Sequence, residues 1–316
     1  MRVKSSATDA TRIAVTDPRE GVGLGTLQAA LGVVAFSLTF PATAWGLEGI
    51  GPWSLVAVRS VLAAVIADCC LCAVGASRDR GRVRWRLPLP DRRHLPGLAV
   101  VGAGVVLGFP LLTTLALQTS TTAHAAVVVG LLPLTTALLS ALRMGTRPSR
   151  TFWAAALAGA AAVLVFTVQQ SGGSLTAADG YLFAALLVCA AGYTEGGRLA
   201  RVMPGWQVIG WALVLCLPLT VPAAALALSY EPVRLTAHGV AGLLWVAAGS
   251  QFLGLVVWYR GMAAIGIPKA SQLQLAQPLV TLVWSVLLLG EHLTAAAPLT
   301  AAAVLVCIAV TQRSRS

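Results

Sequence analysis

The chain has 316 residues, of which 57% are hydrophobic and only 10% are charged, and its net charge is +11. A soluble domain typically carries about 25% charged residues, so this composition excludes an ordinary water-soluble fold and indicates a protein that spans a bilayer. A spanning helix needs about 20 apolar residues, so the chain is long enough for about ten such helices with short loops.

The first 22 residues lack the apolar core of a signal peptide and contain Asp9, Asp17 and Glu20. We interpret residues 1–22 as a disordered cytoplasmic tail. Residues 312–316, at the other end of the chain, are expected to form a short tail on the same side of the membrane.

Ten apolar segments, each bounded by charges or turn residues, follow the N-terminal tail. Each has the length of a spanning helix, and the absence of a two-residue period argues against a transmembrane barrel. We therefore predict an all-α integral membrane protein with ten transmembrane helices, expected at about residues 24–45, 53–76, 96–117, 121–142, 152–169, 180–200, 207–228, 239–260, 268–289 and 294–311.

The 22 Lys and Arg residues are distributed unevenly between the alternating loops. With the N-terminus inside, 20 of them fall in the tails and inner loops, whereas only Arg234 falls outside and Arg59 falls within a span. This asymmetry follows the positive-inside rule, so we expect a bacterial inner-membrane protein with both termini in the cytoplasm. The basic runs are then topology signals, and nucleic acid is not an expected partner.

All six cysteines lie in apolar segments, so we expect no disulfide framework. Cys69, Cys70 and Cys72 form only a weak metal-binding pattern, and we predict neither a metal nor a cofactor. A Walker A motif is absent from the sequence, which argues against ATP-driven transport by this chain alone.

The two halves of the chain resemble each other. Leu132-Pro133-Leu134 precedes Gly145 as Gln277-Pro278-Leu279 precedes Gly290, with 12 residues from proline to glycine in both halves. Five helices per half is an odd number, so the second half is inserted upside down. We expect two inverted five-helix repeats, at residues 23–170 and 179–311, with a binding site near their interface, as in many transporters.

The motif that runs from Ala270-Ser271 through Gln277-Pro278-Leu279 to Leu289-Gly290-Glu291-His292 is similar to that of the drug/metabolite transporter superfamily, EamA type. The resemblance covers about residues 24–311, and Arg59 matches an arginine common in that family's second helix. In the first repeat Thr146 stands where the family usually has Glu. The resemblance implies a ten-helix carrier, often an exporter of metabolites, amino acids or drugs.

Two ionisable residues within spans are candidates for chemistry, because charges in a membrane usually face a cavity. Arg59 is interpreted either as an anion or carboxylate binder or as a structural arginine. Glu195, flanked by glycines, is the candidate for a proton-coupling site; its alternative is an ion pair with Arg198 one helical turn away. A direct pair between Arg59 and Glu195 is not expected, because they should lie at different depths.

Other residues complete the set of candidates. Gln274 and Gln277 share a helix face and are interpreted as cavity lining or as contacts between helices. Pro133 and Pro278 remove backbone hydrogen bonds at equivalent positions and are candidate hinges. The remaining candidates for substrate contact are His124, Lys269, Trp245 and Trp284, where His124 could also be a solvated helix end and Lys269 a topology anchor.

The predicted function is secondary active transport of a small molecule by alternating access. Export is the expected direction, and proton coupling is left open. A membrane-embedded enzyme is the first alternative, although neither an HExxH motif nor paired aspartates occur in the sequence. A lipid scramblase or a non-transporting membrane protein is the second alternative. The expected partners are the substrate and the lipid bilayer, and a homodimer is left open.

Overall fold

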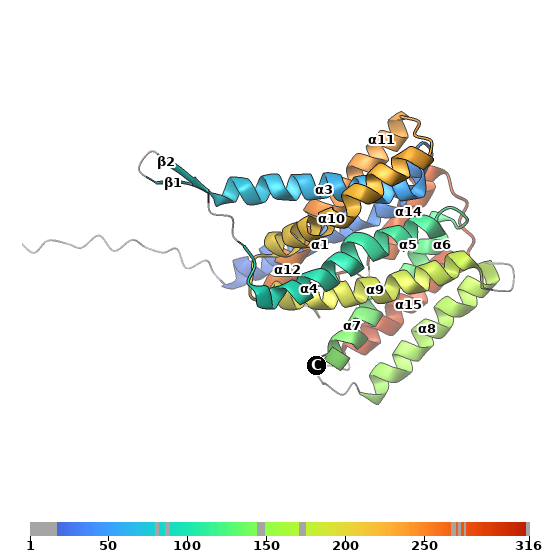
Figure 1. Cartoon of the computed structure of the whole chain (residues 1–316). Coiled ribbons are helices and arrows are strands. Elements are labelled where there is room, and N and C mark those ends of the chain that lie inside the picture. Colours follow the sequence, from blue (N-terminus) through green and yellow to red (C-terminus); the bar gives the residue numbers. More distant parts are fainter. Residues whose placement is uncertain are drawn as a thin grey trace, which may run out of the picture.

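The structure, a computed structural model, describes residues 18–79, 82–85, 89–143, 149–170, 175–266, 270, 273–274 and 276–313. Almost all of these residues are helical (Figure 1). The first half contains α1 (Pro18–Ser37), α2 (Thr39–Leu47), α3 (Pro52–Gly75), η1 (Arg92–His94), α4 (Leu95–Val101), η2 (Gly102–Gly108), α5 (Phe109–Ala116), α6 (Thr122–Val129), α7 (Leu132–Arg143) and α8 (Arg150–Gln170).

The second half contains α9 (Ala177–Leu199), α10 (Gly205–Tyr230), α11 (Ala237–Leu244), η3 (Trp245–Gly254), α12 (Leu255–Ile265), α14 (Ala276–Leu289) and α15 (Ala296–Arg313). Each helical stretch overlaps one of the segments expected from the sequence. Of the tail predicted at residues 1–22, residues 1–17 lie outside the described residues, whereas 18–22 belong to α1 and are helical. Lys269 also lies outside the described residues.

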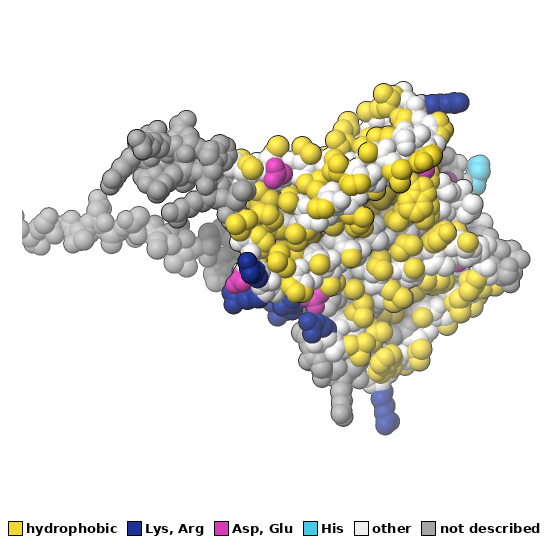
Figure 2. All heavy atoms as spheres, viewed as in Figure 1, with side chains coloured by type: hydrophobic (Ala, Val, Ile, Leu, Met, Phe, Trp, Pro, Cys, Tyr) yellow, Lys and Arg dark blue, Asp and Glu magenta, His cyan; other side chains and the backbone are white. Residues whose placement is uncertain are grey.

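Seven helical stretches of the described chain are long and apolar enough to cross a membrane, and three shorter apolar helices lie at Leu157–Gln169, Ala276–Leu289 and Ala296–Cys307. Hydrophobic side chains cover the flank of the helical bundle, while charged side chains lie toward its ends (Figure 2). Many of the exposed side chains are Leu and Val, including Leu157, Leu187, Leu219 and Leu287. This surface suits lipid, and the protein is a multi-pass membrane protein.

A two-stranded antiparallel hairpin, β1 (Ala76–Asp79) with β2 (Arg82–Trp85), projects from one end of the bundle (Figure 1). We call this end the hairpin end; α4 begins there and α9 ends there. At the opposite end, which we call the far end, α3, α6, α9 and α11 begin (Figure 1). Arg59 lies on α3, eight residues into the bundle from the far end at Gly51.

The two halves of the chain interleave. The most extensive helix pairs are α3 with α10, α1 with α12, and α8 with α15, and each pair joins one helix of the first half to one of the second. Buried side chains from both halves, among them Leu71, Leu182, Ile209 and Trp258, form one large apolar cluster. Any site between the halves is therefore enclosed by helices of both.

Two kinds of helix irregularity occur at corresponding places in the halves. The third helical stretch of each half contains a π-helical segment, η2 in the first and η3 in the second. The fourth stretch of each half contains a proline, Pro133 in α7 or Pro278 in α14, and that of the first half is also interrupted at Gly130–Leu131. The sequence suggested the proline positions but gave no sign of the π-helical segments.

Candidate functional site

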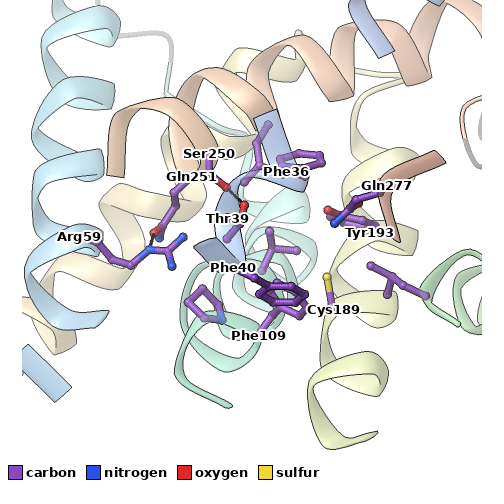
Figure 3. Close-up of a pocket in the computed structure, with 14 residues that line it drawn as sticks. Phe36, Thr39, Phe40, Arg59, Phe109, Cys189, Tyr193, Ser250, Gln251 and Gln277 are labelled. Carbon is purple, nitrogen blue, oxygen red and sulfur yellow. Dashed lines mark hydrogen bonds between the residues drawn. The ribbon is translucent and has the colours of Figure 1, made fainter. Parts of the chain in front are cut away.

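A narrow cavity lies in the middle of the bundle, between helices of both halves (Figure 3). Its aromatic walls come from Phe36, Phe40, Phe109 and Tyr193, and Phe40 and Phe109 lie with ring centroids 6.3 Å apart. The space open to the centres of water molecules is only about 30 Å³, which is room for about two waters. The bundle must therefore widen here before a metabolite can enter.

Arg59 is the charged residue among the described residues that line this cavity. Its side chain comes from α3, is only 3% exposed, and points into the cavity (Figure 3). The Nε atom donates a hydrogen bond to Oε1 of Gln251 on η3, over 2.7 Å. Among the described residues, no carboxylate lies within ion-pair distance of Arg59, so its nearest partner is a neutral amide.

Gln251 is held in place by a backbone carbonyl that a proline leaves available. In an α-helix the carbonyl of Val106 would accept from the N–H of residue 110, but Pro110 has none. Val106 O instead accepts from Gln251 Nε2 at 3.2 Å and from Ser60 Oγ at 3.4 Å. The π-helical segments η2 and η3 are joined through this contact, and the amide oxygen of Gln251 is thereby turned toward Arg59.

A second hydrogen-bonded pair crosses the same cavity. The hydroxyls of Thr39 on α2 and Ser250 on η3 lie 2.7 Å apart and are both buried. Together with Gln251 and Gln277 they give the cavity neutral polar groups on otherwise apolar walls. Such a mixture, with a few placed polar groups, is typical of small-molecule sites.

A smaller cavity adjoins the first and shares Phe40, Leu132 and Gln277 with it. It is lined by both candidate hinge prolines, Pro133 and Pro278, and by Gln274. The interruption at Gly130 lies against the second proline: a Cβ added to Gly130 would lie 3.1 Å from Pro278 Cγ. The structure thus brings Arg59, Gln274, Gln277 and the two prolines to one region between the halves.

At the far end, carboxylates from the second half cap helices of the first half. Glu291 accepts hydrogen bonds from the N–H groups of Thr122 and Ala123, over 2.8 and 2.9 Å. Glu231 accepts from Trp53 and Ser54 in the same way, over 3.3 and 2.7 Å. Carboxylates at these positions satisfy unpaired N–H groups and complement the positive end of each helix dipole.

The Gly290-Glu291 pair of the sequence motif can now be explained. Gly290 has a φ of 65°, which L-residues with a side chain adopt only at a cost, and it ends α14. The chain turns there so that the Glu291 N–H reaches the carbonyl of Ser285 at 3.1 Å, while its carboxylate reaches α6. Glycine therefore makes the turn, and glutamate makes the cap.

His124, in the first turn of α6, lies in a buried hydrogen bond with Asp179 and lines neither cavity. Its Nε2 atom is 2.8 Å from Oδ1 of Asp179 on α9, and the two side chains are 8% and 1% exposed. The ring also stacks on Phe166, with centroids 5.5 Å apart. Asp179 in turn accepts from the backbone and hydroxyl of Thr176 in a capping box. His124 thus links the two halves at the far end.

Glu195 lies at the hairpin end, between two arginines. Its carboxylate accepts from Arg143 Nε at 2.9 Å and from Arg198 Nε at 2.8 Å. The Arg198 contact is the alternative that the sequence left open, and Arg143 is a partner that only the fold reveals. The arginine side chains are 63% and 50% exposed, so this cluster opens to the surface.

The two tryptophan candidates lie away from both cavities. Trp245 is 37% exposed and donates to the carbonyl of Ala35 at 3.4 Å. Trp284 is partly buried and donates to Ser37 Oγ at 3.0 Å, which ties α14 to α1. Lys269 lies outside the described residues.

Sequence reasoning missed Gln251 and Ser250, the two residues that organise the cavity beside Arg59. The signal was present, because Gly249-Ser250-Gln251 is a polar run inside an apolar span, and polar groups in a membrane seek partners.

Comparison with known proteins gives consistent results. The model of the EamA-like transporter family matches this chain twice, at residues 23–168 and 176–312. The chain is 41% identical to an uncharacterized transporter, YdeK, of Bacillus subtilis (strain 168), over 92% of this chain and 97% of that protein. It is 28% identical to a probable terminal-alkyne amino-acid exporter of Streptantibioticus cattleyicolor, over 83% and 84% of the two chains. One solved crystal structure shares the fold, with a TM-score of 0.63 at 21% identity, over 91% of this chain and 97% of the other.

Proposed function

Because the chain belongs to the EamA-like transporter family, we propose that it is a secondary active transporter that exports a small metabolite, amino acid or drug by alternating access. The observation that carries the proposal is the cavity between the two halves, with buried Arg59 on its wall. A charged side chain costs about 2.5–3.5 kcal/mol at the centre of a spanning helix, and such residues usually mark a transport pathway.

The two helix prolines support the alternating-access part of the proposal. Pro133 and Pro278 lie in facing helices of the two halves and line the same small cavity. Proline removes a backbone hydrogen bond and so weakens the helix at that place. We assign them as hinges about which each half bends to open the cavity to one side of the membrane.

The orientation that we propose places the hairpin end in the cytoplasm of a bacterium, with ten spans and both termini inside. The basis is the positive-inside rule, since 20 of the 22 Lys and Arg residues then lie on the inner side. Reporter fusions after Ser316 and within residues 170–178 test it. A periplasmic signal from the C-terminal fusion would contradict this orientation.

The amino-acid exporter among the relatives supports a substrate of similar size. The test is reconstitution of the purified protein in proteoliposomes loaded with a defined mixture of radiolabelled amino acids and small carboxylates. We expect at least one compound to leave faster than from protein-free liposomes, and Gln277→Ala to slow it with little loss of folded protein. If no compound leaves faster than from protein-free liposomes, the result favours a membrane-embedded enzyme or a lipid scramblase instead.

Proton coupling is a further part of the proposal, with Glu195 as the candidate. Arg143 and Arg198 hold its carboxylate in this conformation, so a proton-carrying role requires these contacts to break during the cycle. Glu195→Gln keeps the shape of the side chain and removes the titratable group. Loss of gradient-driven flux per folded molecule supports the role, whereas unchanged flux rejects it.

A further inference from the structure

We infer that the central cavity selects a net-anionic carboxylate with an apolar tail, and discriminates against the zwitterionic amino acid of the same shape. This inference rests on the proposed transport function, and it narrows the substrate class that the cavity takes. It is carried by the charge inventory of the cavity walls.

The first step is the state of Arg59. The guanidinium is 3% exposed, and its Nε atom is occupied by Gln251. The two terminal nitrogens are directed toward the cavity (Figure 3). A carboxylate is the natural partner for these two parallel donors, because a guanidinium binds planar oxyanions through paired hydrogen bonds. A buried charge without a counter-ion is costly, so an anionic ligand relieves that cost.

The second step is the absence of a second charge. The described residues that line the two cavities include no Asp or Glu. Two buried carboxylates elsewhere in the described bundle are engaged, Glu195 with two arginines and Asp179 with His124, and Asp68 of α3 is exposed and lines neither cavity. An ammonium group next to a bound carboxylate would meet the positive charge of Arg59 and no negative one. Like-charge juxtaposition is strongly unfavourable in a site that excludes water.

The third step concerns the rest of the ligand. Opposite Arg59 the walls are aromatic, from Phe36, Phe40, Phe109 and Tyr193. These rings favour an apolar tail, while the neutral hydroxyls of Thr39 and Ser250 already bond to each other. The cavity therefore matches a molecule with one carboxylate end and one apolar end.

The experiment measures binding to the purified full-length protein in detergent, by calorimetry at pH 7.5. Matched pairs differ only in the ammonium group: 3-phenylpropanoate with L-phenylalanine, 4-methylpentanoate with L-leucine, and indole-3-propanoate with L-tryptophan. We expect the anion of at least one pair to bind at least about tenfold more tightly than its amino acid. Equal or tighter binding of the amino acids, or no binding of any anion, would overturn the inference.

Two variants test the assignment to Arg59. Arg59→Gln should lower the affinity for the anion at least about tenfold, and Arg234→Gln, which changes an exposed loop arginine, is the matched control. Because Arg59→Gln could impair folding, Gln251→Glu provides a second route, since it places a carboxylate beside Arg59 in a side chain of the same shape. It should weaken anion binding by a similar factor. Unchanged affinity in folded protein of both variants would contradict the role of Arg59.

The outcome separates the inference from the proposed function. Transport of amino acids in proteoliposomes, with no preference for anions in the binding assay, would leave the transporter standing and reject the anion selectivity. Anion binding without transport of any compound would support the anion selectivity of the cavity and reject the transporter.

Discussion

At each end of the bundle, polar contacts join the two halves of the chain, and the contacts at the two ends differ in burial. At the far end, His124 and Asp179 are 8% and 1% exposed, and Glu291 and Glu231 cap helices of the other half. At the hairpin end, Glu195 is itself 11% exposed, but the arginines that bind it are 63% and 50% exposed. A buried pair is costly to break, whereas an exposed pair contributes about 0–1 kcal/mol. The comparison indicates that the two halves separate less easily at the far end than at the hairpin end.

The largest effect is expected from Asp179→Ala, which removes the partner of buried His124. Asp179 also accepts from Thr176, and each buried polar group that loses its hydrogen-bond partner costs about 1–3 kcal/mol. We expect a clearly lower apparent melting temperature in detergent. The control is Arg93→Ala, which removes a 76% exposed partner of Asp91 and leaves the Asp91 cap in place, and it should change stability by less than about 0.5 kcal/mol. Equal losses of stability from the two substitutions would contradict the difference between buried and exposed contacts.

Gly290→Ala comes next, because Gly290 has a φ of 65° although nothing lies within 4 Å of its added Cβ. The cost is therefore conformational, about 1–2 kcal/mol. Gly180→Ala is the matched control, since that position in α9 is equally open and lies in an ordinary helix. The control should stabilise by about 0.5–1 kcal/mol. Thermal unfolding of both variants measures whether the melting temperature falls for Gly290→Ala and rises for Gly180→Ala.

Glu291→Ala and Glu231→Ala should each cost about 1 kcal/mol, because each removes a helix cap at the far end. The two caps have the same geometry, so the two losses should be similar. Additivity in the double variant would show that the caps act independently, as their separate helices suggest. A loss confined to one variant would mean that the caps are not equivalent.

The smallest effect on stability is expected from Glu195→Gln at the hairpin end, below about 1 kcal/mol, because its arginine partners are solvent-exposed. Its melting temperature should therefore stay close to that of the unaltered protein. A fall in melting temperature as large as that of Asp179→Ala would show that the contacts at both ends stabilise the protein equally.

The features that depend on local pattern could be predicted from the sequence. Helix positions, the equivalence of Pro133 with Pro278 and the candidacy of Arg59 follow from apolar runs, spacing and the rarity of charge in a span. The Arg198 contact of Glu195 was foreseen for the same reason, since it spans one helical turn. The exact number of membrane spans stays a prediction.

The partners that come from distant segments could not be predicted. His124 and Asp179 are 55 residues apart, Arg143 and Glu195 are 52 apart, and Arg59 and Gln251 are 192 apart. Nothing in the local sequence specifies which of several polar residues will face each other across a helix interface. The π-helical segments were equally hidden, because hydrophobic periodicity over so few residues does not separate them from α-helix.

The cap that Glu291 makes on α6 has a consequence for the resting state of the protein. Two identical inverted repeats would make the conformations closed at either end equal in free energy, and each would hold half of the molecules. The first repeat has Thr146 where the second has Glu291, and a threonine carries no charge for a helix dipole. Under the alternating access that we propose, a cap worth about 1 kcal/mol that forms only in the conformation closed at the far end would shift that balance about fivefold. This one departure from symmetry would therefore make the conformation closed at the far end the more populated one in the absence of substrate.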